Sequence, residues 1–190
     1  ITRGLAESNS EDLIIISDVD EIPDLKNINE YLKDKRYAVF KQKAFYYKLN
    51  MQNITLPYWY GSRICKKKYL KSPQWLRNLK FKKRPFWRID KYRLNNIIEN
   101  GGWHFSNLKT PKELLYKYKN MAETKDIFIW EGSVDGKIDP KYLSVEQIEN
   151  SIKEGRNLAG KNAYFQKIEI DNSYPKYILQ NLVKLKEWIV

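Results

Sequence analysis

Residues 13–23 have the sequence Leu13-Ile14-Ile15-Ile16-Ser17-Asp18-Val19-Asp20-Glu21-Ile22-Pro23. The apolar run at its start is rich in β-branched residues and predicts a strand buried on both faces, which the proline should end. Side chains alternate along a strand, so Asp18 and Asp20 would project together while Val19 turns back into the protein. Two carboxylates at one strand end repel each other unless a cation lies between them, and Mg²⁺ and Mn²⁺ prefer such oxygen ligands. The pattern therefore predicts a metal that holds a diphosphate beyond the strand end, where α/β sheets bind ligands.

An alternative for these acidic residues is a solvated turn or the cap of the next helix. Asp24 fits the cap, because apolar residues follow it at helical spacing and predict a helix over residues 24–34. This alternative leaves Asp18 and Asp20 unexplained, since both precede Pro23. We therefore favour the metal hypothesis for the two aspartates.

The other elements are predicted from hydrophobic periodicity and helix caps. Alternating apolar residues predict three strands, over residues 37–42, 44–49 and 57–65. Capping boxes that begin at Thr110 and Ser144 predict two helices, the second ending near Gly160. Tyr174 and Pro175 should open a last helix. These elements are expected to be scaffold.

Two stretches of the chain resemble a known enzyme family. The sequences Asp18-Val19-Asp20-Glu21-Ile22-Pro23 and Gly101-Gly102-Trp103-His104-Phe105-Ser106 are similar to those of the β-1,4-mannosyl-glycoprotein N-acetylglucosaminyltransferases (the type III, or bisecting, enzymes) and their microbial or viral relatives. Arg3-Gly4-Leu5 and residues 144–156 fit the same pattern, so the resemblance covers most of the 190 residues. It implies an α/β fold of the GT-A type, a mixed sheet flanked by helices. It also implies a metal-dependent, inverting transfer of N-acetylglucosamine from a UDP-sugar to a glycan or glycoprotein acceptor.

The resemblance implies a metal site, and two glutamates that lie near its motifs are candidate bases, with an ordinary surface carboxylate as the alternative for each. A lone histidine such as His104 is by itself more often a core residue, but in GT-A enzymes a later histidine often completes the metal shell begun by the Asp-x-Asp. We therefore expect Asp18, Asp20 and His104 to hold one Mn²⁺, or Mg²⁺, with the imidazole favouring Mn²⁺. The acceptor hydroxyl must lose its proton to a base, for which Glu21 and Glu99 are the candidates. Spacing does not choose between these two.

Five further residues are candidates for substrate binding. A guanidinium matches phosphate oxygens, so Arg77 and Arg88 could grip the diphosphate; the alternative is that each pairs with a surface carboxylate. Trp59 could stack on an acceptor sugar or fill the core or edge of the sheet. Trp103 could pack under the sugar or in the core. Arg3 belongs to the upstream part of the resemblance.

The length of 190 residues fits a single glycosyltransferase domain over residues 1–190. In the GT-A fold, a nucleotide-binding βαβ portion precedes the Asp-x-Asp strand, whereas only 12 residues precede Leu13 here. We therefore expect the chain to be the metal- and acceptor-binding part of a longer enzyme, with the nucleotide-binding portion short or missing. On its own it should bind a nucleotide sugar weakly or not at all.

The net charge of +12 makes a nucleic-acid-binding domain the main rival hypothesis. However, Lys66-Lys67-Lys68 and Lys82-Lys83-Arg84 are local clusters without a zinc-finger spacing, RNP motif or Gly-rich loop, so nucleic acid is the less favoured partner. A third hypothesis is a non-catalytic carbohydrate-binding or interaction module. No apolar run approaches the roughly 20 residues of a membrane span. The compartment stays open: cytoplasm for a microbial or viral protein, Golgi lumen for a eukaryotic one.

Overall fold

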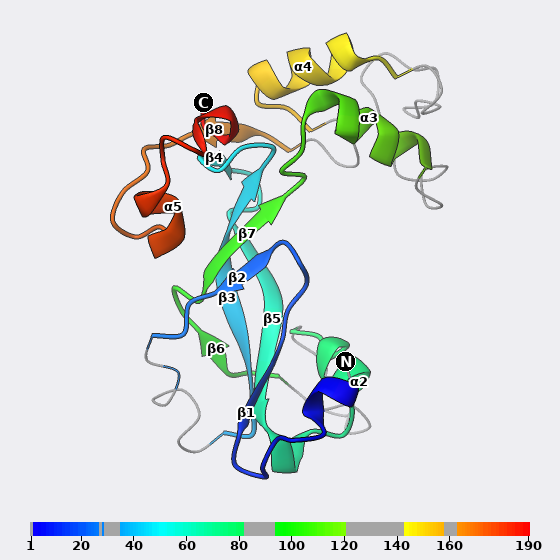
Figure 1. The fold of residues 1–190 in the computed structure, drawn as a ribbon, viewed down its shortest axis with the longest axis vertical. Coiled ribbons are helices and arrows are strands. Elements are labelled where there is room, and N and C mark those ends of the chain that lie inside the picture. The colour runs from blue at the N-terminus through cyan, green and yellow to red at the C-terminus, as the bar shows by residue number, and fades with distance from the viewer. Residues whose placement is uncertain (1, 27, 29–34, 82–93, 121–142, 158–162) are drawn as a thin grey trace. The chain divides into compact units, whose positions relative to one another are not determined.

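The computed structural model describes residues 2–26, 28, 35–81, 94–120, 143–157 and 163–190 (Figure 1). Over these residues the protein is mixed α/β, with a mixed sheet and few helices. The strands are β1 (Leu13–Ile16), β2 (Glu21–Pro23), β3 (Tyr37–Tyr46), β4 (Met51–Asn53), β5 (Tyr58–Lys66), β6 (Ile97–Ile98), β7 (Gly102–Ser106) and β8 (Phe165–Lys167). The α-helices are α2 (Pro73–Arg77), α3 (Pro111–Asn120), α4 (Val145–Lys153) and α5 (Lys176–Gln180), and the 3₁₀ turns are η1 (Thr2–Leu5), η2 (Lys67–Tyr69) and η4 (Lys186–Trp188). Among the helices described, none has the length and apolar character needed to cross a membrane.

The chain forms two compact units. The first comprises Ile1–Lys43 and Tyr58–His104, and the second comprises Ala44–Pro57 and Phe105–Val190. In the first unit β5 lies between β1 and β3 and is antiparallel to both (Figure 1). The sheet is mixed because β6 runs parallel to β3.

Strand β1 confirms the strand predicted at the start of residues 13–23. Ile14 and Ile16 are buried in one hydrophobic cluster, while Ile15 packs against another that includes Ile64. The prediction that the whole run is buried on both faces is wrong for Leu13, which is 38% exposed. The reason is that β1 is an end strand of the sheet, so its outer edge has no neighbouring strand among those described.

A β-bulge interrupts the pairing of β3 with β5. The register shifts between Val39 and Lys41, and over this interval β5 has one residue more than β3. Gly61 and Ser62 therefore lie opposite the single residue Phe40. A bulge bends its strand and re-aims side chains. Neighbouring residues of a regular strand point to opposite faces. The bulge therefore explains why Gly61 and Ser62 both approach the same carboxylate, which is described below.

The second unit holds the predicted capped helices. In α3, Thr110 N–H donates to Glu113 Oε2, and Ser144 makes the corresponding capping box with Gln147 at the start of α4. Both helices cover one hydrophobic cluster, whose buried members are Tyr47, Met51, Leu114, Tyr118, Leu143, Ile148, Ile152 and Phe165. The predicted end of the second helix near Gly160 is wrong, because α4 ends at Lys153 and the left-handed glycine just beyond it is Gly155, with φ of 64°.

Four other predicted elements differ in extent or are described only in part. The two strands predicted over residues 37–49 form one strand, β3, which stops where Tyr47 adopts a φ of 64°. The last predicted helix forms only as the short α5. Of the helix predicted over residues 24–34, Ile28 is helical and buried, and residues 27 and 29–34 lie outside the described part of the chain.

The first predicted basic cluster is engaged with the N-terminal segment. Lys66 and Lys68 form ion pairs with Glu11 at 2.8 and 2.6 Å. Lys67 donates hydrogen bonds to the Leu5 carbonyl and the Ser8 hydroxyl. The hydrogen bonds from the two outer lysines lower the pKa of Glu11 to about 2. This cluster therefore holds its own chain rather than presenting unpaired charge.

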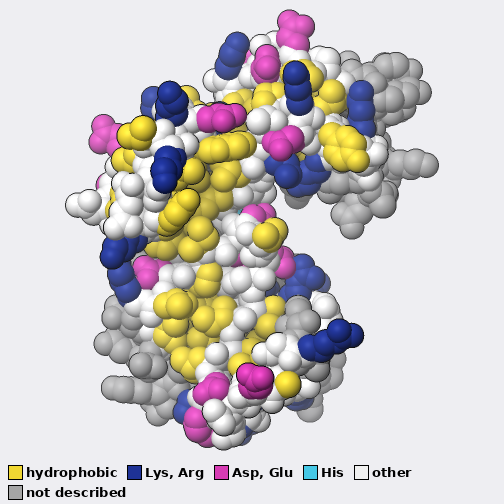
Figure 2. Space-filling model, viewed as in Figure 1, with side chains coloured by type: hydrophobic (Ala, Val, Ile, Leu, Met, Phe, Trp, Pro, Cys, Tyr) yellow, Lys and Arg dark blue, Asp and Glu magenta, His cyan; other side chains and the backbone are white. Residues whose placement is uncertain are grey.

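Basic side chains do not merge into one patch on the surface shown in Figure 2. The Lys and Arg side chains on that face form separate groups with acidic and hydrophobic groups between them (Figure 2). The second predicted cluster, residues 82–84, lies outside the described residues. The distribution on this face differs from the continuous basic stripe that is typical of nucleic-acid-binding domains.

Candidate functional site

The two aspartates lie on a tight turn between β1 and β2. The Glu21 N–H donates to the Asp18 carbonyl at 3.1 Å, and the Asp18 N–H donates back to Glu21 Oε2 at 3.1 Å. Val19, at the tip of the turn, is fully exposed. The prediction that Asp18 and Asp20 project together from an extended strand with Val19 inward is therefore wrong. Hydrogen bonds between acidic side chains and nearby backbone groups favour such turns over strands.

The proline has a different role from the predicted one. The first strand already ends at Ile16, and Pro23 is the last residue of β2. Strand β2 pairs antiparallel with β7, with Ile22 opposite Trp103 and Glu21 opposite His104. The two stretches that carry the family resemblance are therefore hydrogen-bonded neighbours.

Asp20 lies beside the only histidine of the chain. The distance from Asp20 Oδ2 to His104 Nε2 is 3.2 Å, although the residues are 84 positions apart. The His104 side chain is 13% exposed and that of Asp20 is 37% exposed. The structure thus brings together two of the three predicted metal ligands, one oxygen donor and one nitrogen donor.

Asp18 instead binds Arg77. Its Oδ1 and Oδ2 lie 2.8 and 3.0 Å from Arg77 Nη2. Helix α2 positions this arginine in its last turn, and Ser72 caps the start of the helix by accepting a hydrogen bond from Trp75 N–H. The carboxylate raises the pKa of the Arg77 guanidinium above its ordinary value. The alternative foreseen for Arg77, pairing with a carboxylate, is what the structure shows, and the partner is a predicted metal ligand.

Glu21 is the buried centre of the site. Its Oε1 accepts a hydrogen bond from Trp59 Nε1 at 2.7 Å, and its Oε2 accepts one from Ser62 Oγ at 2.8 Å. The Asp18 N–H is the third donor. The side chain is buried, and a buried carboxylate loses its hydrogen bonds to water. The three donors replace those bonds and so stabilise the charge.

A short chain of hydroxyl groups continues from Glu21 into the sheet. Ser62 Oγ also accepts from Gln42 Nε2 at 3.2 Å and lies 2.6 Å from Ser17 Oγ. A hydroxyl has one hydrogen, and that of Ser62 is directed at the Glu21 carboxylate, so Ser17 is the donor in the second contact. The network fixes Ser17, directly before the turn, to β5 and thereby positions the turn that carries both aspartates.

Gly61 makes room for this network. A Cβ atom added at Gly61 would overlap the Glu21 carboxylate and the Trp59 indole nitrogen. A residue without a side chain is therefore required where the carboxylate crosses β5. The bulge and the glycine together allow Glu21 to lie flat against the strand.

The two candidate tryptophans have different environments. Trp59 is 46% exposed, and its ring stacks on His104 with the centroids 4.9 Å apart and the planes at 17°. Trp103 is buried, and its indole nitrogen has no hydrogen-bond partner in the described residues. For Trp103 the structure shows the foreseen alternative, a core position, whereas Trp59 presents an open aromatic face beside Asp20 and His104.

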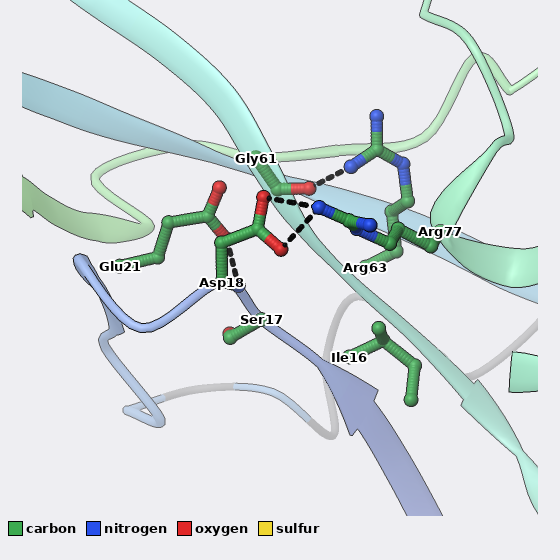
Figure 3. Close-up of a pocket in the computed structure, with 7 residues that line it drawn as sticks. All are labelled: Ile16, Ser17, Asp18, Glu21, Gly61, Arg63 and Arg77. Carbon is green, nitrogen blue, oxygen red and sulfur yellow. Dashed lines mark hydrogen bonds and ion pairs between the residues drawn. The ribbon is translucent and has the colours of Figure 1, made fainter. Parts of the chain in front are cut away.

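A small hollow lies next to the turn, and Asp18, Glu21 and Arg77 face into it (Figure 3). Its volume, open solvent included, is about 150 Å³. Arg63 also lines it and is held by the carbonyls of Leu79 and Gly61. Partial burial lowers the pKa of the Arg63 guanidinium. Since pockets for whole ligands occupy roughly 300–1,000 Å³, a hollow of this size suits one charged group rather than a nucleotide sugar.

The remaining predicted site residues lie elsewhere. Glu99 is exposed and forms an ion pair with Lys41 at 2.9 Å. Arg3 is exposed on η1, and Arg88 lies outside the described residues. Neither Glu99 nor Arg3 is among the residues that line the hollow.

The donor types at this site suit a divalent metal, but the three predicted ligands are not gathered. Within the described residues, no group of three or more His, Cys, Asp or Glu side chains is arranged to hold a metal ion. Asp20 and His104 already meet, and two oxygens and one imidazole nitrogen are donors that Mn²⁺ accepts. The guanidinium of Arg77 supplies the positive charge that Asp18 requires. Of the three predicted ligands, the structure therefore shows two in contact with each other and the third paired with an arginine.

Sequence reasoning missed Ser17, Ser62, Gln42, Gly61 and Arg63. One signal was available for two of them, because Gln42 and Ser62 are polar residues within strands that are otherwise apolar and aromatic. Such residues require buried partners when the strand is central. The contacts of Arg63 and the role of Gly61 depend on the bulge and leave no local signal.

No protein-family model, curated protein or solved structure matches this chain. The family resemblance therefore rests on the two motifs and on the neighbouring positions quoted from the sequence.

Proposed function

We propose that this chain is the metal- and acceptor-binding part of a GT-A-like, inverting glycosyltransferase. In this proposal it moves a sugar, N-acetylglucosamine by family resemblance, from a UDP-sugar to a glycan acceptor. The contact between Asp20 and His104 carries the proposal. It supports a common function for the two motifs, because it joins a carboxylate and an imidazole from stretches that are far apart in the sequence.

The chemistry requires the leaving diphosphate to be neutralised. Asp20, His104 and Asp18 would hold Mn²⁺ or Mg²⁺, which when bound stabilises the charge of the leaving group as a Lewis acid. Arg77 and Arg63 line the hollow beside the turn and would supply positive charge to the diphosphate there. A guanidinium is suited to phosphate oxygens because of its planar array of donors.

Trp59 is the proposed platform for the acceptor. Its ring is half exposed, and it is held by the hydrogen bond to Glu21 and by the stacking contact with His104. A rigid aromatic face loses little conformational freedom when a sugar ring packs against it. The acceptor would thereby lie beside the residues that hold the metal.

The two candidate bases are distinguished by their contacts. Glu21 is engaged by three hydrogen-bond donors, which supports a positioning role for it. Glu99 is exposed and paired with Lys41. Transfer rates of the Glu21→Gln and Glu99→Gln chains, compared over a range of pH, would separate a base from a positioning residue, because loss of the base removes one limb of the pH profile.

The proposal is tested by Mn²⁺-dependent hydrolysis or transfer from UDP-N-acetylglucosamine. At a donor concentration high enough to offset the weak binding expected of the chain on its own, activity should require Mn²⁺ and be lost in Asp20→Ala. Asp12→Asn is the matched control, because Asp12 precedes β1 whereas Asp20 follows it, and this variant should keep the activity. Mn²⁺ binding should be measured on the same samples by electron paramagnetic resonance. A chain that binds no Mn²⁺ at millimolar concentration would exclude the proposed metal site.

Two other functions would give different results in this experiment. Binding of glycans without transfer, unaffected by Asp20→Ala, would identify a non-catalytic carbohydrate-binding module. A DNA affinity that falls steeply with salt and is unchanged in Asp18→Ala would identify a nucleic-acid-binding domain. The pairing of Lys66 and Lys68 with Glu11 makes the second outcome the less expected one.

A further inference from the structure

The loop after β4, in the second unit, contains a sequence to which an oligosaccharide can be attached. Asn53, Ile54 and Thr55 form the only Asn-X-Ser/Thr sequence among the 190 residues. Asn53 is the last residue of β4, and the loop that follows it is exposed. Such sequences are the acceptors of N-linked glycans, which occupy surface loops of secreted proteins. Three residues recur easily by chance, so the structure around them has to support the assignment.

The side chain of Asn53 is held in one orientation by its own loop. Its Oδ1 accepts hydrogen bonds from the Thr55 N–H at 3.0 Å and from the Leu56 N–H at 2.8 Å. Its Nδ2 has no hydrogen-bond partner among the described residues and is not buried. Because both contacts of Oδ1 are local, the turn can form before the rest of the unit folds. The nitrogen that a glycan would modify is therefore accessible.

Thr55 supplies the hydroxyl group of the acceptor sequence. Its Oγ1 accepts a hydrogen bond from the Tyr164 N–H at 3.0 Å, so its own hydrogen remains available as a donor. The Ile54 N–H donates to the Tyr164 carbonyl at 2.9 Å. These two bonds join the loop to the residue before β8, and Tyr164 therefore lies beside the acceptor sequence.

The apolar side chains next to Asn53 are exposed. Ile54, Leu56 and Tyr164 are 52%, 67% and 48% exposed, respectively. Single exposed apolar residues are ordinary, but neighbouring ones form a patch that favours a covering group. The first sugar of an N-linked glycan carries C–H groups and an N-acetyl methyl group, which can pack against such side chains. The apolar patch of Ile54, Leu56 and Tyr164 thus matches the group that Asn53 would carry.

We propose that Asn53 is a glycosylation site in a chain that enters a secretory compartment, and that the first N-acetylglucosamine of the glycan covers the apolar patch. The Asn53 Nδ2 forms a bond to the anomeric carbon of a polyprenyl-diphosphate-linked oligosaccharide. The bond from that carbon to the diphosphate oxygen breaks, the polyprenyl diphosphate leaves, and the amide proton passes to a base of the oligosaccharyltransferase. The inference goes beyond the proposed function and does not depend on it, because it uses none of the residues around Glu21.

The site is tested by translating the full chain, preceded by a signal peptide, in the presence of microsomes. Only chains that the microsomes protect from added protease are scored, so every scored chain has reached the lumen. The parent chain should gain the mass of one glycan. This gain should be lost in Asn53→Gln and in Thr55→Ala and kept in Thr55→Ser, which retains the hydroxyl group. A protected parent chain without a glycan would overturn the site.

Asn172→Gln is the matched control for the site. Asn172 is also exposed, but the second residue after it is Tyr174 rather than serine or threonine. This variant should therefore gain the same mass as the parent chain. A glycan that is lost in Asn172→Gln and kept in Asn53→Gln would overturn the assignment to Asn53.

Coverage of the apolar patch is tested with two forms of the same polypeptide. One is the glycosylated chain, trimmed by an endoglycosidase that leaves a single N-acetylglucosamine, and the other is the unmodified chain made in the bacterial cytoplasm. The trimmed form should bind less of an apolar fluorescent dye, and the difference should disappear when both forms carry Ile54→Ser and Leu56→Ser. Folding of each form is checked by circular dichroism. Equal dye binding by the two parent forms would overturn the coverage and leave the site at Asn53 standing.

Discussion

Trp59 and Glu21 are joined by a 2.7 Å hydrogen bond from the indole nitrogen to the carboxylate, although they are 38 residues apart. The bond links β5 to the start of β2, and its acceptor also binds the backbone of Asp18. The same indole stacks on His104. One buried carboxylate and one aromatic ring thus position both aspartates and the histidine.

We predict that Gly61→Ala destabilises the first unit by about 1–3 kcal/mol, because the new methyl group must displace the Glu21 carboxylate from its donors. Urea-induced unfolding measures the loss. Gly4→Ala is the matched control, since nothing lies within 4 Å of a Cβ atom at that position. Equal stability of the two variants would contradict the close approach at Gly61.

Glu21→Gln should lower the free energy of unfolding by about 1–3 kcal/mol, because an amide cannot accept from all three donors and leaves one buried N–H or O–H unmatched. Glu99→Gln makes the same chemical change at an exposed ion pair and should have little effect. Both are measured by urea-induced unfolding at neutral pH. A larger loss in Glu99→Gln would show that the hydrogen bonds of Glu21 do not hold the turn.

Trp59→Phe should cost about 0.5–1.5 kcal/mol of stability through the lost N–H donor while keeping a stacking surface. We expect it to retain binding of an N-acetylglucosamine oligosaccharide, followed by NMR titration, whereas Trp59→Ala should lose it. Tyr58→Ala is the control: Tyr58 is similarly exposed, but it points to the opposite face of β5. Glycan binding that depends on Tyr58 and not on Trp59 would place the acceptor on the other face.

The ion pairs that join Glu11 of the N-terminal segment to Lys66 and Lys68 should weaken as the pH falls from 4.5 towards about 2. Lys66 and Lys68 lower the pKa of Glu11 from its ordinary value of 4.5 to about 2. As the pH falls below 4.5, the unfolded chain takes up this proton first, so the stabilisation by Glu11 is complete above pH 4.5 and is lost as the pH approaches 2. Urea midpoints of the parent chain and of Glu11→Gln should therefore differ at pH 6 and converge near pH 2. The double variant Lys66→Gln/Lys68→Gln should show the same loss of pH dependence, and parallel curves would contradict the pairing.

Local signals predicted the elements that depend on neighbours in the sequence. Some elements are determined by residues that lie within them. They are the helices with capping boxes at Thr110 and Ser144 and the β-branched strand β1, and all three formed. The turn at Asp18 was mistaken for a strand because its main anchor is distant: Glu21 is bound by Trp59 and Ser62 of β5. Pattern alone could not reveal those partners.

The site was predictable to the extent that the family resemblance paired two motifs. It placed Asp20 and His104 together, whereas spacing within either stretch says nothing about the other. The contact of Asp18 with Arg77 spans 59 residues and depends on where α2 packs, so sequence could supply Arg77 as a candidate but not its partner. The bulge that brings Gly61 and Ser62 to Glu21 arises from the register between β3 and β5, and no local sequence pattern marks it.

The order of synthesis gives the long separation between Asp20 and His104 a further meaning. Translation at roughly 5–20 residues per second delays the imidazole behind the carboxylate by several seconds. During roughly the first half of that delay β5, the strand that pairs with β1, has not yet been synthesised. A β-branched strand without its partner promotes aggregation, and the turn that carries both aspartates follows this segment directly.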